Sequence, residues 1–565
     1  MSSASHSSIS RPSGTRSSVT LNDVSFAWPD GTPALSGLTG SFGGGRTGLV
    51  GTNGTGKSTL LRLLAGRLTP SSGQIITNGD VGYLPQTLTL DAAHTVAGLL
   101  GIRDKLDALH AIESGDVDER HFDTLGDDWD LETRADEALR AIGLSAVDLD
   151  RSVAELSGGE AMLVAITGLR LQRTAITLLD EPTNNLDRAA RASLRDLVRS
   201  WYGTLIVVSH DTALLECMDA TAELHGGRLS VFGGPYCEWL EHRQQEQSAA
   251  AQAVRTAEQA VRAEKRQKAE AETKLARRAR TAQKNYENRT AAKIVMNQKA
   301  SNAQVAAGKL RSGGDERLNA ATNALDAAEA RLRDDEAIHL ELPDPAVPRG
   351  KRIAELHSGE LRRGDSANDD GADCGGGETF YLQGPERVAI VGANGVGKTT
   401  LLEQLVSGDA APADRASGIL HTSRVGYLSQ RLDGLDGASD SIDNIRSVAP
   451  NVEPGDIRNR LARLLLRGDS VHRAVQTLSG GERFRVALAR LLFAEPPPQL
   501  LVLDEPTNNL DLQSVEQLVA ALRSYRGAVL IVSHDDAFLD RIGLDRVLEL
   551  DADGGLRELR DRLEA

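Results

Sequence analysis

Two short glycine-rich segments have the composition and spacing of loops that bind nucleotide phosphates. They read GTNGTGKST at Gly51–Thr59 and GANGVGKTT at Gly392–Thr400. The glycines allow backbone N–H groups to close around phosphate oxygens, and Lys57 and Lys398 can reach the outer phosphates. The hydroxyls of Ser58 and Thr399 are suitable ligands for Mg²⁺. An apolar strand precedes each segment and a leucine-rich helix follows it, so a chance glycine-rich turn is a poor explanation.

We therefore predict two phosphate-binding sites, each with Mg²⁺. The residues expected around the phosphates are Gly51, Asn53, Gly54, Gly56, Lys57, Ser58 and Thr59 in the first site, and Gly392, Asn394, Gly395, Gly397, Lys398, Thr399 and Thr400 in the second.

Two acidic pairs could complete the chemistry of these sites. Asp180-Glu181 and Asp504-Glu505 each follow an apolar run that reads as a buried strand. An aspartate at the carboxyl end of a strand can bind Mg²⁺, and the adjacent glutamate can act as a general base on water. An isolated Asp-Glu pair is usually a solvated surface pair. The preceding strand and the associated glycine loop favour the catalytic interpretation.

An internal repeat organises the chain. Besides the glycine loop, three motifs occur twice in the same order: LSGGE at Leu156–Glu160 and Leu478–Glu482, LDEPTNNLD at Leu179–Asp187 and Leu503–Asp511, and SHD at Ser209–Asp211 and Ser533–Asp535. The glycine loop and LSGGE lie 105 residues apart in the first repeat and 86 in the second. A short insertion is therefore expected in the first repeat, at about residues 100–143.

The periodicity of the chain predicts an α/β fold with a helical linker. Short Val, Ile and Leu runs in each repeat read as buried parallel strands that alternate with helices. From Tyr236 to Leu342 there is no proline, and Ala, Gln, Glu, Lys and Arg dominate. Apolar residues at 3,4 spacing, such as Val254, Ala257 and Val261, predict two long helices packed as a hairpin. The turn is expected near Asn285–Gly314.

Composition excludes several classes of protein. The chain has 565 residues and a formal net charge of −16, which excludes a uniformly basic nucleic-acid binder. Its three cysteines form no C-x-x-C pair, so a zinc or redox site is not expected. No apolar run is long enough to span a membrane, and the first 18 residues read as a disordered tail without a signal peptide. A cytoplasmic location is expected.

The repeated motifs resemble those of ATP-binding-cassette ATPases. LSGGE is similar to the signature, LDEPTNNLD to the Walker B strand and D-loop, and SHD to the switch histidine. Two cassettes on one chain, separated by a charged helical linker, resemble the ABC-F family of ribosome-acting proteins in particular. The resemblance implies two ABC ATPase domains in tandem that close head to tail and use ATP and Mg²⁺.

The resemblance also assigns roles to further residues. It implies that Glu181, Glu505, His210 and His534 are catalytic and that Trp28 stacks on adenine. Metal ligands would be Ser58, Gln86 and Asp180 in one site and Thr399, Gln430 and Asp504 in the other. Signature residues Ser479, Gly480, Gly481 and Glu482 would complete the site that contains Lys57, and Ser157, Gly158, Gly159 and Glu160 would complete the site that contains Lys398. The second repeat has no clear aromatic counterpart of Trp28.

A basic cluster in the linker suggests a polyanionic partner. Residues 274–311 contain ten basic side chains and one acidic one. A solvated helix face is the ordinary explanation of a charge run, but it does not account for a cluster at the expected hairpin turn. The resemblance identifies the partner as the 70S ribosome, through rRNA and the P-site tRNA. The candidate RNA-binding residues are Arg277, Arg278, Arg280, Lys284, Arg289, Lys293 and Lys299.

The sequence thus predicts an ABC-F ATPase that binds the ribosome in its ATP-closed form through the linker and is released on hydrolysis. Antibiotic resistance and translation regulation both remain open as its role. The alternative is the ATPase subunit of an exporter with a separate membrane partner, which would leave the basic hairpin unexplained. The predicted domains are a tail (1–18), a first ABC domain (19–240), a basic hairpin (241–343) and a second ABC domain (344–565).

Overall fold

The structure is a computed structural model that forms two compact units. One unit is Cys237–Ala337. The other is made of Met1–Tyr236 and Ile338–Ala565, which contain the first and the second repeat. The described residues are 18–88, 95–144, 148–184, 186–287, 293–330, 342–359, 378–409, 412, 415–430, 432, 434–464, 466, 468–508 and 510–559. Side chains are described for these residues except 282–283, 285–287, 293–300, 303–304, 306–307 and 469. Of the predicted tail, 1–18, only Ser18 is described, so that prediction lies outside the described residues.

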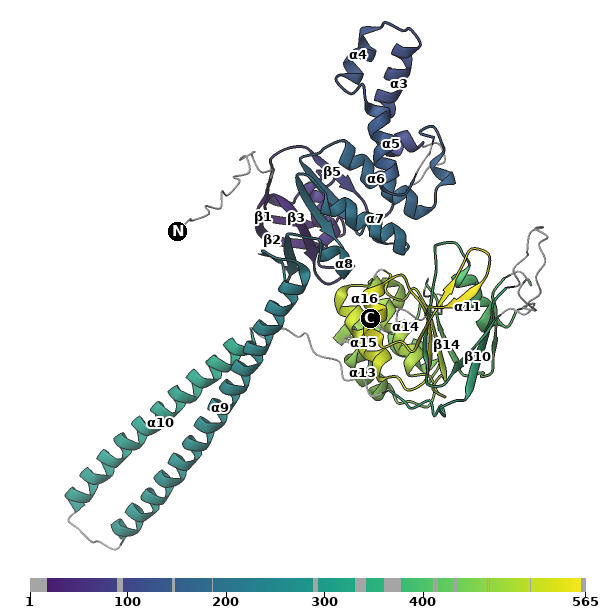
Figure 1. Ribbon diagram of the computed structural model, residues 1–565. Helices are drawn as coiled ribbons and strands as arrows, with labels where there is room; N and C mark the ends of the chain where they lie inside the picture. Colours follow the sequence, from purple (N-terminus) through teal and green to yellow (C-terminus); the bar gives the residue numbers. More distant parts are fainter. Residues whose placement is uncertain are drawn as a thin grey trace, which may run out of the picture. The chain divides into compact units, whose positions relative to one another are not determined.

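Each repeat is built around a six-stranded sheet (Figure 1), as the alternating pattern predicts. The strand orders are β5-β6-β7-β3-β8-β9 and β14-β15-β16-β12-β17-β18, and only the last pair in each sheet is antiparallel. Every residue of β6, β7, β15 and β16 is buried, which explains their near-continuous apolar sequences. The strands are β3 (Gly45–Val50), β5 (Val81–Leu84), β6 (Ile176–Asp180), β7 (Thr204–Val208), β8 (Ala220–His225) and β9 (Arg228–Phe232), then β12 (Arg387–Val391), β14 (Val425–Leu428), β15 (Leu500–Asp504), β16 (Ala528–Val532), β17 (Arg546–Leu550) and β18 (Leu556–Glu558).

A smaller antiparallel sheet accompanies the main sheet in each repeat. Its order is β2-β1-β4 in the first repeat and β11-β10-β13 in the second. The buried side chains of the small sheet and those of one face of the main sheet form a single apolar cluster with the helix after the glycine loop. The elements are β1 (Val19–Ala27), β2 (Pro33–Phe42), β4 (Ser72–Thr77) and α1 (Lys57–Leu64), then β10 (Arg352–His357), β11 (Thr379–Gln383), β13 (Ser417–Leu420) and α11 (Lys398–Ser407).

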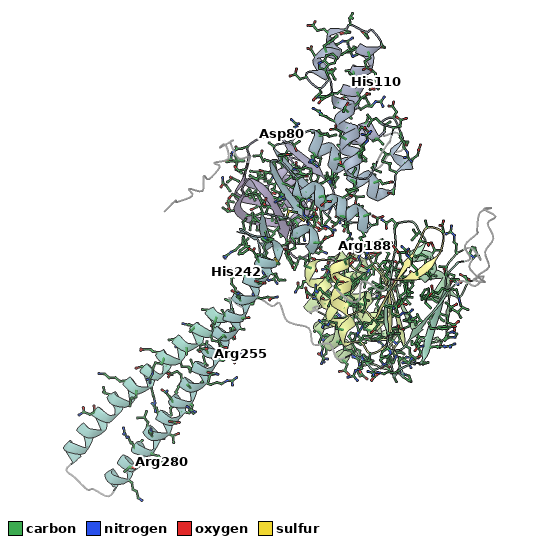
Figure 2. The ribbon with its side chains drawn as sticks, in the orientation of Figure 1. Asp80, His110, Arg188, His242, Arg255 and Arg280 are labelled. Atoms are coloured by element: carbon green, nitrogen blue, oxygen red, sulfur yellow. The ribbon has the colours of Figure 1, made fainter. Side chains whose placement is uncertain are left out.

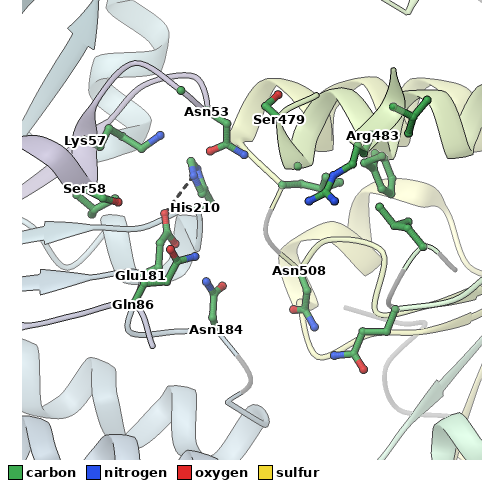
Figure 3. A pocket seen from close by; sticks show the side chains of 18 of the residues that line it. Asn53, Lys57, Ser58, Gln86, Glu181, Asn184, His210, Ser479, Arg483 and Asn508 are labelled. Atoms are coloured by element: carbon green, nitrogen blue, oxygen red, sulfur yellow. Dashed lines mark ion pairs between the residues drawn. The ribbon is translucent and has the colours of Figure 1, made fainter. Parts of the chain in front are cut away.

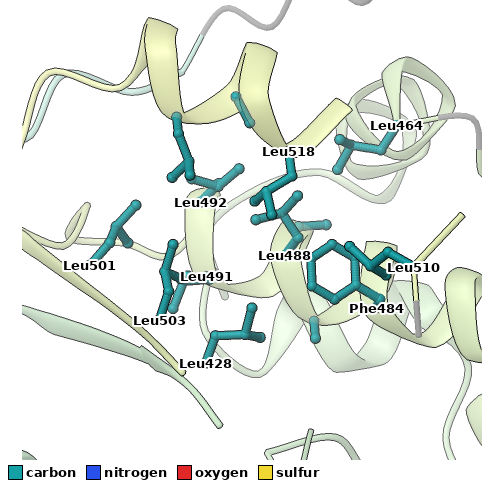
Figure 4. Packing of buried hydrophobic residues seen from close by; sticks show 14 of the residues in the cluster. Leu428, Leu464, Phe484, Leu488, Leu491, Leu492, Leu501, Leu503, Leu510 and Leu518 are labelled. Atoms are coloured by element: carbon teal, nitrogen blue, oxygen red, sulfur yellow. The ribbon is translucent and has the colours of Figure 1, made fainter. Parts of the chain in front are cut away.

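Helices cover the other face of each main sheet. In Figure 4, Leu488, Leu491 and Leu492 of α14 pack near Leu501 of β15 and Leu518 of α15. Each buried leucine contributes about 1.5–3 kcal/mol to stability, so this layer fixes the position of the LSGGE segment that begins α14. The helices are α2 (Val96–Leu99), α6 (Gly158–Leu171), α7 (Arg188–Arg199) and α8 (Thr212–Leu215), then α12 (Ser441–Arg446), α13 (Pro454–Arg463), α14 (Gly480–Leu492), α15 (Leu512–Ser524) and α16 (Asp536–Ile542), with 3₁₀ turns at Val153–Glu155, Gly468–His472 and Val475–Thr477.

The insertion in the first repeat is a pair of helices, α3 (Arg103–Glu113) and α4 (Glu119–Leu125). The following helix, α5 (Leu131–Ala141), corresponds to α13 of the second repeat. Both helices end in a turn in which a later leucine N–H donates to the carbonyl of a leucine in the last turn of the helix. In that turn Leu144 N–H donates to Leu139 O, as Leu466 N–H donates to Leu461 O. By this comparison only α3 and α4 lack a counterpart in the described part of the second repeat, and the range 100–143 for the insertion stays a prediction.

The unit between the repeats contains two long helices, α9 (Tyr236–Glu287) and α10 (Lys293–Glu329). Ion pairs link them in an antiparallel hairpin: Lys268 Nζ lies 2.6 Å from Asp315 Oδ1, and Arg317 Nε lies 3.8 Å from Glu264 Oε2. The predicted hairpin is confirmed, but the domain limits 241–343 stay a prediction.

The turn of the hairpin is narrower than the sequence suggests. Gly308, Gly313 and Gly314 lie within α10, because α9 ends at Glu287 and α10 begins at Lys293. A glycine inside a helix costs only about 1 kcal/mol, which packing against a partner helix can offset. None of the helices in the described ranges is long and apolar enough to cross a lipid bilayer.

We predict that the hairpin depends on its inner apolar row. Val261 is only 7% exposed, whereas the neighbouring Ala260 is exposed. Val261→Asp should bury a carboxylate and destabilise the hairpin locally by on the order of 2 kcal/mol or more. Amide hydrogen exchange along α9 and α10 should therefore accelerate, with Ala260→Asp as the control for the added charge. Equal exchange in the two variants would contradict the packing.

Candidate nucleotide-binding sites

Each glycine loop turns directly into a helix with its lysine at the first helical position. The residues before α1 and α11 are Gly56 and Gly397, with φ angles of 94° and 100°. Residues other than glycine rarely adopt such positive φ angles. Lys57 Nζ donates to Gly51 O at 2.7 Å and to Thr52 O at 3.1 Å. Burial lowers the pKa of Lys57, while the charges of nearby carboxylates act in the opposite direction. The carbonyl groups of the loop therefore hold the lysine ammonium group in place.

The second loop repeats this geometry. Lys398 Nζ donates to Gly392 O at 2.9 Å and to Ala393 O at 2.7 Å. Burial also lowers the pKa of Lys398. The two predicted lysines thus occupy equivalent positions in the two repeats.

The predicted Mg²⁺ ligands lie beside the loops. Ser58 Oγ donates to Asp180 Oδ1 at 3.0 Å, so both predicted ligand groups meet at one point. In the second repeat, both carboxylate oxygens of Asp504 are buried and make no hydrogen bond within the described part of the chain. Burial raises the pKa of Asp180 and of Asp504, because it disfavours the charged carboxylate. A bound cation would stabilise the charged form. Hydroxyl and carboxylate oxygens are the donors that Mg²⁺ prefers, so these residues fit the ion.

A buried glutamate and a histidine form a pair in each repeat. Glu181 Oε1 lies 3.1 Å from His210 Nε2, as the dashed line in Figure 3 marks, and Glu505 Oε1 lies 3.4 Å from His534 Nε2. Burial raises the pKa of Glu181 and of Glu505 to about 7. Burial lowers the pKa of His210 to about 3 and that of His534 to about 4. A carboxylate of near-neutral basicity beside a neutral imidazole is suited to accept a proton from water.

The backbone at both glutamates is strained and anchored. Glu181 has a φ of 50° and Glu505 a φ of 46°, in the left-handed region that non-glycine residues seldom adopt. Their N–H groups donate to Val208 O at 2.8 Å and Val532 O at 2.9 Å, at the carboxyl ends of β7 and β16. The strand edges therefore determine where the two carboxylates point.

The LSGGE segments form the amino termini of α6 and α14. Ser157 and Ser479 cap these helices, and each forms a capping box with the glutamate three residues later. Glu160 Oε2 accepts the Ser157 N–H at 2.8 Å, and Glu482 Oε2 accepts the Ser479 N–H at 2.9 Å. Both glutamates thus stabilise the helix start, and their predicted role as nucleotide ligands stays a prediction.

Two aspartates that the predicted sites omit connect the repeats. Asn53 N–H of the first glycine loop donates to Asp511 Oδ2 at 2.8 Å, and Asn394 N–H of the second donates to Asp187 Oδ2 at 3.4 Å. Each aspartate also caps the helix that follows it, α15 or α7. Their position at the end of both LDEPTNNLD motifs was the signal in the sequence. Spacing alone could not reveal that their partners belong to the other repeat.

A cleft of about 810 Å³ brings together residues of both repeats (Figure 3). Lys57, Glu181 and His210 lie on one side of it, and Ser479 and Arg483 lie on the other. The predicted residues that line the cleft are Trp28, Asn53, Gly54, Gly56, Lys57, Ser58, Thr59, Gln86, Glu181 and His210 from the first repeat, and Gln430, Ser479, Gly480, Asp504 and Glu505 from the second. Among its described lining residues, none belongs to the second glycine loop or to Ser157–Gly159. Arg483 was not predicted.

The basic linker residues are only partly described. Arg277, Arg278, Arg280 and Lys284 are exposed on α9, and Figure 2 marks Arg280 near the end of that helix. Arg289 lies outside the described residues, and the side chains of Lys293 and Lys299 are not described. The predicted RNA contacts stay a prediction.

Comparisons with known proteins agree with this architecture. The family model described as ABC transporter matches residues 41–184 and 377–508. The chain is 32% identical over 520 residues to the tylosin resistance ATP-binding protein TlrC of Streptomyces fradiae, covering 87% of this chain and 90% of that protein. It is 30% identical over 530 residues to the energy-dependent translational throttle protein EttA of Escherichia coli K12, covering 89% and 86%.

A solved structure resembles the fold. The archaeal ribosome recycling factor aABCE1, in its complex with the ribosomal stalk protein aP1, aligns with a TM-score of 0.53 and 20% identity over 95% of this chain and 89% of that one. The paired glycine loops, LSGGE helices and buried Asp-Glu strands recur in both repeats, and the sequence relatives match along most of the chain. The protein therefore belongs to the ABC-F family of tandem ATP-binding-cassette ATPases.

Proposed function

We propose that this protein hydrolyses ATP in two composite sites and binds the ribosome through its linker while ATP holds the repeats closed. The observation that carries the proposal is that each glycine loop donates one backbone hydrogen bond to an aspartate of the other repeat. A loop that binds phosphate in one repeat is thereby coupled to the position of the other repeat.

In the first composite site, Lys57 and the loop N–H groups bind the phosphates, and the amino terminus of α14 faces them across the cleft. A helix amino terminus has positive potential, so Ser479 and Gly480 stabilise the terminal phosphate only when the repeats approach each other. The second site follows by repeat symmetry, with Lys398 facing Ser157 at the start of α6. The arrangement makes each repeat incomplete without the other.

Within each site, the buried glutamate accepts a proton from the attacking water. The neutral His210 orients Glu181 from Nε2 at 3.1 Å, whereas Glu505 is oriented by the backbone N–H of His534, which donates to its Oε2 at 3.4 Å. Mg²⁺ would be held by Ser58 and Asp180, or by Thr399 and Asp504, and would supply charge neutralisation on the phosphate oxygens. Gln86 and Gln430 line the same cleft and would be further ligands.

The ribosome is proposed as the partner from charge and from the relatives' names. Residues 274–311 have a net charge of +9 in a chain whose total is −16, so this segment suits contacts with a polyanion. One relative is a translational throttle protein and another confers tylosin resistance. Both roles, translation regulation and resistance, are consistent with a cytoplasmic protein whose linker contacts rRNA and the P-site tRNA.

We predict that the two glutamates are the catalytic bases. Glu181→Gln with Glu505→Gln removes both proton acceptors while preserving shape, so turnover should fall on the order of 10²-fold or more with ATP binding retained. Steady-state hydrolysis and nucleotide content after gel filtration measure the two effects. Turnover at the parental rate would show that other groups act as bases.

We predict that each signature acts on the opposite site. In a Glu505→Gln background, only the site with Lys57 hydrolyses ATP. Adding Ser479→Arg should abolish that activity, because the side chain would occupy the phosphate-facing end of α14. Adding Ser157→Arg, the matched change in the other signature, should leave it within about twofold of the background. Single-turnover hydrolysis decides between them, and the reverse pattern would exclude head-to-tail pairing.

We predict that the basic end of α9 binds the ribosome. Replacing Arg277, Arg278, Arg280 and Lys284 with Glu should release the double Gln variant from 70S ribosomes, because phosphate contacts dominate such binding. The control is the same change in charge at Arg255, Arg262, Lys265 and Arg266, exposed residues nearer the start of α9. Co-sedimentation with ATP measures binding. If both variants pellet equally, the cluster is a solvated face, and an exporter role becomes the better explanation.

A further inference from the structure

The two repeats differ at the side of the glycine loop where the nucleotide base would lie. In the first repeat, Trp28 follows β1 and lines the cleft, with its ring edge-on to Phe26 at a centroid distance of 5.2 Å. This position supplies a flat apolar surface to a purine. The small sheets allow the corresponding position in the second repeat to be located from their register.

The second repeat has no aromatic residue in the sequence at the position that corresponds to Trp28. Ser25 of β1 pairs with Ser72 of β4, and His357 of β10 pairs with Ser417 of β13. Trp28 lies three residues after Ser25, and the residue three after His357 in the sequence is Glu360, which lies outside the described residues. No Phe, Tyr or Trp occurs anywhere from 358 to 379 in the sequence. The second repeat consequently needs another group to hold a base.

The same register places an arginine beside the second glycine loop. Arg415 lies two residues before Ser417, where the first repeat has Pro70 before Ser72. A Cβ on Gly397 would lie 3.9 Å from Arg415 Nη1. At the equivalent Gly56, the nearest atoms instead belong to Leu35 and Ala34 of β2. A guanidinium thus lies against this turn of the loop, where the first repeat has the Leu35 side chain and the Ala34 carbonyl oxygen.

The guanidinium is available for a ligand. Arg415 is exposed, and within the described ranges its side chain makes no hydrogen bond or ion pair. Its backbone N–H donates to Pro412 O at 3.1 Å. A guanidinium is planar and weakly hydrated, so it can stack on a nucleobase as an aromatic ring does, whereas an ammonium has no flat face.

We propose that Arg415 holds the adenine of ATP in the second site by stacking, in place of the ring that Trp28 provides in the first. The inference rests on the proposed function, since it requires a second ATP site at Lys398. The two sites would then bind the same nucleotide through different forces on the base: ring stacking in one and a cationic plane in the other.

The test uses the full chain with Lys57→Ala, so that the second site is the one that binds ATP. Arg415→Ala and Arg415→Lys should each weaken ATP binding about tenfold, because stacking on a base contributes about 1–3 kcal/mol. Arg415→Trp should remain within about twofold of the Lys57→Ala parent, since it restores a flat surface. None of the three changes should alter the binding of inorganic tripolyphosphate, which has no base. Titration calorimetry measures both ligands.

The control pair lies in the first site, tested with Lys398→Ala. Pro70→Ala, the positional equivalent of Arg415→Ala, should leave ATP binding unchanged, whereas Trp28→Ala should weaken it about tenfold. Because Arg415 is exposed, its variants should unfold at the parental temperature.

Other outcomes would overturn the inference in distinguishable ways. If Arg415→Lys binds ATP normally while Arg415→Trp loses both ATP and tripolyphosphate, the arginine contacts phosphate instead of the base. If no Arg415 variant changes ATP binding, the arginine has no role in recognition, and the second site stands without it. If the Lys57→Ala parent binds no ATP, both the second site of the proposed function and this inference are wrong.

Discussion

The burial of a glutamate next to a lysine at the edge of a parallel sheet is the constraint on which the rest of each repeat depends. Glu181 is only 6% exposed and has a left-handed φ of 50°, and burial raises its pKa to about 7. Removing such groups from water is costly unless the surroundings compensate. The compensation comes from the lysine of the glycine loop, the histidine that follows the next strand and the strand edge itself. Strands, loops and capped helices all converge at this edge because parallel strands end there together.

Repetition does not make the two halves equivalent. The second repeat reproduces the Lys398, Glu505 and His534 geometry, but it lacks α3 and α4 and any aromatic residue equivalent to Trp28. The groups proposed to bind phosphate and to accept a proton are duplicated, whereas the position of Trp28 and the insertion have diverged. This division is physically reasonable, because triphosphate chemistry requires fixed geometry, while a base needs only a flat surface on which to stack.

Charge separates the two kinds of contact in the molecule. The glycine loops rely on a few buried cations whose pKa values are lowered by desolvation. The linker carries many exposed cations that remain hydrated, of which Arg277, Arg278 and Arg280 are examples. Buried cations contribute through geometry and are insensitive to salt, whereas exposed ones contribute through long-range attraction that salt weakens. In the proposed function, this difference would let one chain bind a small anion tightly and a polyanion reversibly.

The duplicated α/β fold, the helical hairpin and the two glycine loops could be predicted from the sequence alone. These features depend on local patterns: a strand of Val, Ile and Leu, glycines at fixed offsets, and long stretches without proline. Local pattern was less informative where a residue's role depends on packing. The turn of the hairpin was expected near Asn285–Gly314, yet Gly308, Gly313 and Gly314 lie inside α10, where the partner helix runs alongside.

Which distant residues are in contact could be learned only from the folded structure. Asp187 and Asp511 look like simple helix caps in the sequence, but each also accepts an N–H from the glycine loop of the other repeat. Arg415 has no motif around it, and only the strand register and its closeness to Gly397 connect it with the nucleotide loop. Spacing along the chain encodes periodicity and local turns. The approach of two segments hundreds of residues apart depends on how buried surfaces pack, and no local pattern records that.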